Sequence, residues 1–118
     1  LPPLHAVFGA TRRSAGIWVL PPLAAGNAST SGSLHIGPIH VVLEAAAVDL
    51  ATAAADTDRL QAEGWSVFFT ARGTHGPFAA SGVATAGQGG RVACRLDFRD
   101  EGREGRVVAS AQAVFRVR

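Results

Sequence analysis

The spacing of apolar residues changes once along this chain, and that change limits the possible folds. From Ile39 to about Glu63, apolar and small side chains recur at helical spacing, and Pro38 occupies the first turn, where proline is favoured. The residues that set this spacing are Ile39, Leu43, Ala46, Leu50, Ala53 and Ala54. The pattern predicts one long helix that ends before Gly64.

After Gly64 the apolar residues alternate with a period of two, which is typical of strands. The alternating runs are Trp65 to Ala71, Phe78 to Thr85, Arg91 to Arg99 and Arg106 to Arg118. Turns are expected at 72–77, 87–90 and 100–105, so successive strands are predicted to be antiparallel neighbours. An earlier strand is predicted at Ile17 to Leu20, after an irregular entry that ends near Ala10, and residues 24–33 are expected to form a loop.

The order strand, long helix, four strands predicts an α+β protein. An Ala-rich helix with so few charges needs cover over most of its surface, and a curved antiparallel sheet wrapped around it supplies that cover. At 118 residues the chain fits one domain, so we expect a single domain spanning residues 1–118.

The composition excludes several classes of protein. Hydrophobic residues make up 47% and charged residues 17%, which excludes intrinsic disorder, and no uninterrupted apolar stretch approaches the roughly 18 residues of a membrane span. The net charge is only +2, and the arginines are scattered among nine acids, so we expect no nucleic-acid partner. The single cysteine, Cys94, cannot form an internal disulfide, and the given sequence does not open with a cationic stretch followed by an apolar run, so we expect a cytoplasmic location. Cys94 alternates with core residues, so we expect a buried thiol.

A loop-to-helix motif precedes the predicted helix. Gly32, Leu34, His35 and Gly37 are followed by Glu44, nine residues after the histidine and the only carboxylate between Ile39 and Val48. Two further motifs are Gly76-Pro77-Phe78-x-Ala80 and the run from Val108 to Phe115. Together these residues resemble the hotdog-fold thioesterases, specifically the PaaI-like (phenylacetate-degradation) and 4-hydroxybenzoyl-CoA type.

The resemblance implies a hotdog fold, a homodimer or dimer of dimers, and hydrolysis of an acyl-CoA thioester without a cofactor. It implies that Glu44 of one subunit acts as base or nucleophile while the backbone N–H groups of Ile36 and Gly37 of the other polarise the carbonyl. Such groups point outward at a helix start and carry positive partial charge. Two positions depart from the family motif: Ile36 replaces a glycine, and Pro38 offers no N–H.

Other polar residues are candidates for supporting roles by the same resemblance. Ser66 matches a hydroxyl position that helps to hold the water in some relatives; the alternative is that it is an ordinary serine on the solvent-facing side of a strand. Ser29 is a candidate to replace the family's loop asparagine, with Asn27 two residues earlier and ordinary turn chemistry as the alternative. His35 is expected to fix the loop by hydrogen bonding or to act on the substrate.

The substrate-binding candidates are Asn27 in the loop, His40 on the helix, Arg72 in a turn and Arg91 at the start of a strand. His40 precedes Glu44 by four residues and so shares its helix face, where it can pair with the carboxylate. Arg72 and Arg91 are candidates to bind the phosphates of coenzyme A, because guanidinium matches phosphate bidentately. The histidines have no zinc-binding spacing, so we expect no metal.

Two other functions stay open. A hydratase or dehydratase of this fold also carries a proline six residues before the glutamate, as Pro38 and Glu44 are placed, but it needs an upstream histidine where Thr30 stands. A non-catalytic module that binds acyl groups or only assembles is favoured by Ile36 and Pro38. A Ser-triad hydrolase is not expected, because no Gly-x-Ser-x-Gly elbow occurs.

Overall fold

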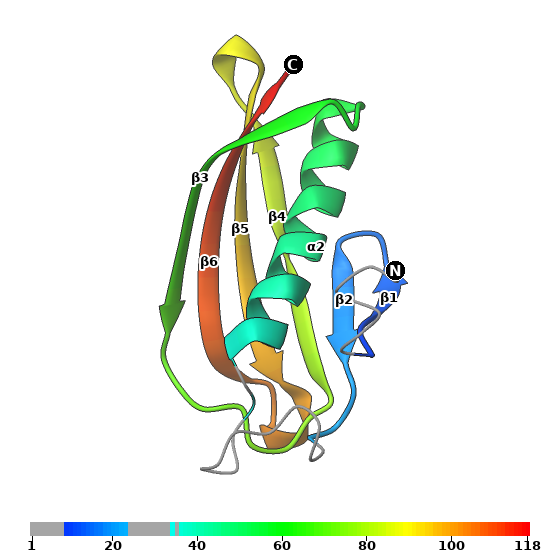
Figure 1. Ribbon diagram of the computed structural model, residues 1–118, viewed down its shortest axis with the longest axis vertical. Coiled ribbons are helices and arrows are strands. Elements are labelled where there is room, and N and C mark those ends of the chain that lie inside the picture. The colour runs from blue at the N-terminus through cyan, green and yellow to red at the C-terminus, as the bar shows by residue number, and fades with distance from the viewer. Residues whose placement is uncertain (1–8, 24–33, 35) are drawn as a thin grey trace.

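The protein consists of one long helix packed against a six-stranded antiparallel sheet (Figure 1). The computed structural model describes residues 9–23, 34 and 36–118. The elements are β1 (Thr11–Ser14), β2 (Ile17–Leu20), α2 (Ile36–Ala55), β3 (Leu60–Phe69), β4 (Phe78–Ala86), β5 (Arg91–Asp100) and β6 (Arg106–Val117). Two 3₁₀ turns, η1 (Gln88–Gly90) and η2 (Glu101–Arg103), join the last three strands.

The strand order in the sheet is β1-β2-β4-β5-β6-β3. The predicted meander is confirmed for β4, β5 and β6, but it is wrong for β3, which pairs with β6 at the edge of the sheet and not with β4. Alternation along a strand shows which side chains face the core and does not show which strand lies alongside. The sheet thus has β1 at one edge and β3 at the other (Figure 1).

The helix boundaries differ from those predicted. α2 begins at Ile36 and ends at Ala55, and the residues from Leu60 to Glu63 belong to β3. The chain leaves the helix at Asp56, whose φ of 55° lies in the left-handed region and stops helical propagation. Gln61, Ala62 and Glu63 have good intrinsic helix propensity, but pairing with β6 outweighs it.

The core lies between α2 and the sheet. The helix buries Ile39, Val42, Leu43, Ala46, Ala47 and Ala51. The alternation predicted for β5 is confirmed, since Val92, Cys94, Leu96 and Phe98 are buried on the helix-facing side. The small side chain of Ala47 lets the helix approach closely enough for the Cys94 thiol to donate to the Ala47 carbonyl at 3.7 Å, and burial raises the pKa of that thiol.

By length and apolar composition α2 could also cross a membrane. Here its apolar residues pack on the sheet, and the same two properties are those of a core helix.

A short hairpin, β1 and β2, completes one end of the sheet. β1 was not expected from the sequence, because Thr-Arg-Arg-Ser shows no apolar alternation. Asp49 of α2 secures the hairpin by accepting hydrogen bonds from Arg12 Nε at 2.6 Å, Trp18 Nε1 at 2.9 Å and the Gly16 N–H at 3.3 Å. Burial raises the pKa of Asp49, but these donors outweigh it and hold the pKa below its ordinary value.

Candidate active site

The start of α2 presents backbone donors to solvent. Ile36 is 58% exposed and Gly37 is exposed, and a Cβ added at Gly37 would meet nothing within 4 Å. The first N–H groups of a helix have no partner within it, and Pro38 contributes none. Ile36 and Gly37 therefore keep two N–H groups directed out of the helix start, with open space beside the second.

Glu44 lies farther along α2 and is exposed. It belongs to a stripe at four-residue spacing, together with Ile36, His40 and Val48, that the sheet leaves partly or fully uncovered. Eight residues separate Ile36 from Glu44, so at 1.5 Å per residue they are about 12 Å apart along the helix axis. One carbonyl group cannot contact both within one chain.

His40 does not pair with Glu44, so that expectation is wrong. Among the described residues the histidine makes no ion pair, and its ring lies 5.8 Å from the ring of Phe69 and 6.5 Å from that of Trp65, centroid to centroid. Both aromatic residues belong to β3. The register of this strand, which aligns them on the helix-facing side, offers the imidazole an apolar surface that the sequence could not reveal.

The edge strand β3 is exposed along almost its whole length. Trp65 and Phe69 oppose the buried Ala113 and Ala109 of β6, which places them on the side of the sheet that faces α2. They remain 38% and 43% exposed respectively. Together with His40 of the stripe on α2 they form a partly exposed apolar surface between the helix and the sheet edge.

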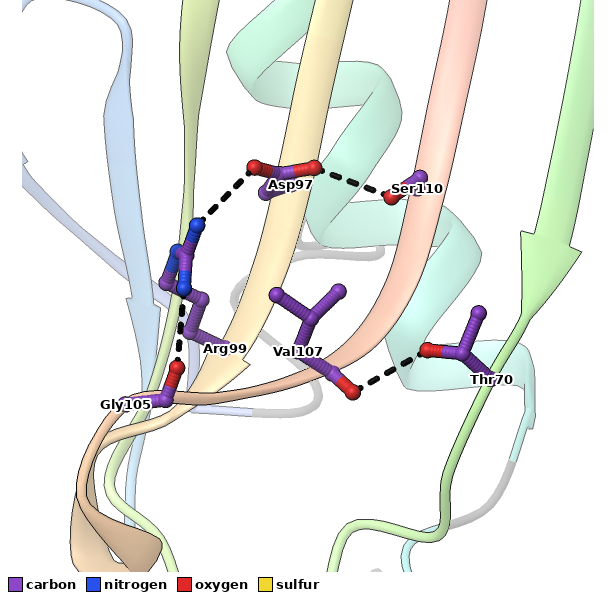
Figure 2. Close-up of polar contacts among 6 residues, drawn as sticks. All are labelled: Thr70, Asp97, Arg99, Gly105, Val107 and Ser110. Atoms are coloured by element: carbon purple, nitrogen blue, oxygen red, sulfur yellow. Dashed lines mark hydrogen bonds and ion pairs between the residues drawn. The ribbon is translucent and has the colours of Figure 1, made fainter.

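Ser66 lies on the opposite face of the sheet. It pairs in register with Gln112, between Trp65 and Val67, so its side chain points away from α2 and is not brought together with Glu44. On this outer face, shown in Figure 2, Asp97 accepts hydrogen bonds from Ser110 and Arg99. A shallow hollow of about 380 Å³ beside Phe68 lies there too, and it contains neither Glu44 nor the helix start.

No protein-family model and no curated protein matches this sequence. Solved structures match it over nearly the whole chain. A protein of the thioesterase superfamily has a TM-score of 0.81 at 18% identity, covering 99% of this chain and 90% of its own. A mutant of the phenylacetic acid degradation protein PaaI from Thermus thermophilus has a TM-score of 0.76 at 15% identity, covering 99% of this chain and 100% of its own. A thioesterase candidate from Ralstonia eutropha, related to phenylacetic acid degradation, has a TM-score of 0.79 at 16% identity, over 99% and 91% of the two chains.

This is the hotdog fold. The fold prediction, a curved antiparallel sheet around one long helix, is confirmed. In hotdog terms, α2 is the central helix, and Glu44 lies on the part of it that the sheet leaves open.

The two candidate arginines lie at different places in this hotdog domain. Arg72 is exposed in the connection between β3 and β4, next to Gly73, whose carbonyl accepts a hydrogen bond from Leu34 just before α2. Arg91 starts β5 beside η1, where its Nε donates to Glu63 at 2.9 Å. Figure 1 shows that this end of the sheet is the one far from the start of α2.

Three predicted site residues, Asn27, Ser29 and His35, lie outside the described residues, as does Thr30. Within the described part of the chain no group of three or more His, Cys, Asp or Glu side chains could hold a metal ion.

Sequence reasoning missed one residue near the helix start. Asp100 is the last residue of β5 and is 0% exposed, the only buried polar or charged residue among those described. In the sequence Asp100 is the first residue of the turn predicted at 100–105. Its only sequence signal is that turn.

Proposed function

We propose that this protein is an acyl-CoA thioesterase that acts as a dimer, with each site shared between two chains. The observation that carries the proposal is the distance of about 12 Å along α2 between the helix-start donors and Glu44. A second chain related by a two-fold axis runs its helix in the opposite direction, which can bring Glu44 of one chain to the helix start of the other. The exposed edge of β3 offers the pairing surface.

The reaction adds water to the thioester and releases a carboxylic acid and a thiol. The N–H groups of Ile36 and Gly37 stabilise the negative charge that develops on the carbonyl oxygen. Glu44 takes a proton from water as the water oxygen bonds to the carbonyl carbon, the carbon–sulfur bond then breaks, and the proton passes to the leaving thiolate. In the alternative role a Glu44 oxygen bonds to the carbonyl carbon, the carbon–sulfur bond breaks and the thiolate leaves, and water then hydrolyses the resulting anhydride to the carboxylic acid and free Glu44.

Residues around this site are assigned supporting roles in the proposal. Arg72, exposed next to the segment that contacts Leu34, is the better placed of the two arginines to bind coenzyme A phosphates, since Arg91 is engaged by Glu63. His40 provides part of an apolar wall with Trp65 and Phe69. Asn27, Ser29 and His35 stay candidates in the loop, and Ser66 is not used because its side chain points away from α2.

The similarity to thioesterase-superfamily structures supports the reaction class, and the site geometry supports the shared arrangement. A second function, a non-catalytic module that binds acyl groups, is supported by one specific observation. Ile36 is 58% exposed at the helix start. Its side chain would reduce the space available to a thioester carbonyl bound to the N–H groups there. A panel of acyl-CoA and acyl-carrier-protein thioesters, followed by trapping of free thiol, separates the two functions.

Replacing Glu44 tests the chemistry. Glu44→Gln keeps the shape and removes the base, so we expect thioester hydrolysis to fall about 10²- to 10⁴-fold with an unchanged circular dichroism spectrum. Glu104→Gln, at an exposed turn residue between β5 and β6, is the matched control and should keep full activity. Undiminished hydrolysis in folded Glu44→Gln would show that Glu44 is not the base or nucleophile.

Mixing two inactive variants tests whether the site is shared. Gly37→Pro removes a helix-start donor in a turn that tolerates proline, and it should be inactive alone. After unfolding and refolding together with Glu44→Gln, half of the dimers are mixed, and each mixed dimer has one intact site. Activity should therefore return to about a quarter of the wild-type value. If no activity returns although mixed dimers form, each site lies within one chain and the shared arrangement is wrong.

A further inference from the structure

The buried carboxylate of Asp100 is held by backbone N–H groups, three from one short segment and a fourth from Gly102 in the turn that follows it. Its Oδ1 accepts the N–H of Gly76 at 2.8 Å, and its Oδ2 accepts the N–H groups of Thr74 and His75, each at 3.1 Å. Burial raises the pKa of Asp100, but these donors outweigh it and hold the pKa below its ordinary value. The carboxylate thus fixes three successive residues of the connection between β3 and β4.

The same connection contacts the chain just before α2. The carbonyl of Gly73 accepts a hydrogen bond from the N–H of Leu34 at 2.8 Å, and Leu34 is buried with only 5% of its surface exposed. A Cβ added at Gly73 would lie 2.8 Å from the ring of Phe78 and 3.2 Å from the Cβ of Leu34. Gly73 therefore packs closely against Leu34 and Phe78, with no space for a side chain at position 73.

Leu34 lies two residues before Ile36, the first residue of α2. We infer that Asp100 is a positioning residue for hydrolysis: it fixes the 73–76 segment, that segment fixes Leu34, and Leu34 sets the position of the donors at the start of α2. The inference rests on the proposed function for its effect on activity. Oxyanion donors accelerate a reaction only when they are held in place before the charge develops, within about 0.5 Å of their productive position.

Asp100→Asn tests the inference by replacing one acceptor oxygen with an NH₂ group that faces N–H donors. The amide of Leu34 should exchange its hydrogen at least about tenfold faster by NMR, because the bond to Gly73 O opens more often. For the same reason kcat should fall about 10- to 100-fold while KM changes less than about threefold. A residue that only stabilised the fold would not separate kcat from KM in this way.

Asp97→Asn is the matched control. Asp97 lies on the same strand, but its carboxylate accepts hydrogen bonds from Ser110 and Arg99 on the outer face of the sheet (Figure 2). Exchange at Leu34 and both kinetic constants should stay at their wild-type values.

Gly73→Ala provides a second, independent perturbation if Asp100→Asn does not fold. The added methyl group displaces Leu34 while the carboxylate and its donors stay intact, so exchange should rise and kcat fall as above. Unchanged exchange at Leu34 in a folded variant overturns the inference whatever the activity, and so does an equal fall of kcat in Asp97→Asn. If exchange rises as expected but the wild type hydrolyses no thioester, the anchoring by Asp100 is supported and the proposed function fails.

Discussion

The two edges of the sheet are built in opposite ways. At one edge β1 has four residues, an irregular register between Arg12 and Ser14, and two exposed arginines. At the other edge β3 has ten residues, one charged side chain, Glu63, and three exposed aromatic residues, Trp65, Phe68 and Phe69. Short, charged and irregular edges resist pairing with another chain, whereas long and apolar edges invite it.

The hydrogen bonds and ion pairs reinforce this difference. Arg12 donates to Asp49 of α2, and Arg13 forms a two-point ion pair with Glu101 at 2.8 and 3.0 Å, so the charges of β1 are engaged within the chain. On β3 the aromatic side chains stay exposed although they are large and apolar. The difference favours β3 as the pairing edge of the proposed dimer, and His40 of the Glu44 stripe lies beside this edge.

Phe69→Arg should have the largest effect, because it changes both dimer formation and thioester hydrolysis. The side chain is 43% exposed on the helix-facing side of β3, so a second chain on this edge would bury the new charge without a partner. An unpaired buried charge costs about 3–5 kcal/mol, enough to shift a micromolar dimer to monomer. We expect a monomer in sedimentation velocity and the loss of thioester hydrolysis, because each proposed site needs two chains.

Thr11→Arg, at an exposed position of β1, is the control for this experiment and should keep both the dimer and the activity. A folded Phe69→Arg variant that is still a dimer would exclude β3 as the pairing edge. A monomer with full activity would exclude the shared site.

Asp49→Asn should loosen the other edge without affecting assembly. The carboxylate accepts three hydrogen bonds from the β1–β2 hairpin, so we expect the free energy of unfolding to fall by about 1–2 kcal/mol in urea titrations. Asp97→Asn, whose ion pair is about half exposed, should cost less than about 0.5 kcal/mol. The dimer and its activity should be unchanged, and a loss of either would show that the β1 edge takes part in pairing.

The pH dependence of the same interaction has a definite sign. The pKa of Asp49 is lowered in the folded protein, so its contribution to stability is complete above the unfolded pKa of about 4 and is lost as the pH falls through the lower folded value. The stability difference between wild type and Asp49→Asn should therefore be constant near neutral pH and shrink below about pH 4.

The strands also differ in whether the sequence pattern alone predicts them. Strand β5 could be predicted because Val92, Cys94, Leu96 and Phe98 occupy every second position, mostly between charged residues, and one covered face imposes that period. β1 and the first four residues of β3, Leu60 to Glu63, could not be predicted as strands, because their conformation comes from pairing with other strands and not from their own pattern.

Some features of the candidate site could likewise be predicted from the sequence, and others could not. Ile36, Gly37 and Glu44 could be selected as candidates because they fall in register with the family motif that the sequence resembles, and because Glu44 is the only carboxylate between Ile39 and Val48. The contacts of His40 with β3 depend on strand register, and the burial of Asp100 depends on a segment 24 to 26 residues away. Local sequence carries no trace of either.

Ile36→Gly should have the smallest effect, and it tests what the residue at the start of α2 contributes. If Ile36 supplies only its N–H, glycine should keep or raise turnover, because the exposed side chain no longer crowds the thioester carbonyl. The free energy of unfolding should fall by about 0.5–1 kcal/mol, since glycine loses more backbone freedom on folding. Val48→Ala, on the same stripe of α2 but three turns away, should leave turnover unchanged.

A folded Ile36→Gly variant with turnover lowered tenfold would show that the isoleucine side chain itself holds the acyl group. An inactive wild type that gains hydrolysis on this substitution would instead identify a non-catalytic acyl-binding module, in which Ile36 blocks the position that the thioester carbonyl needs.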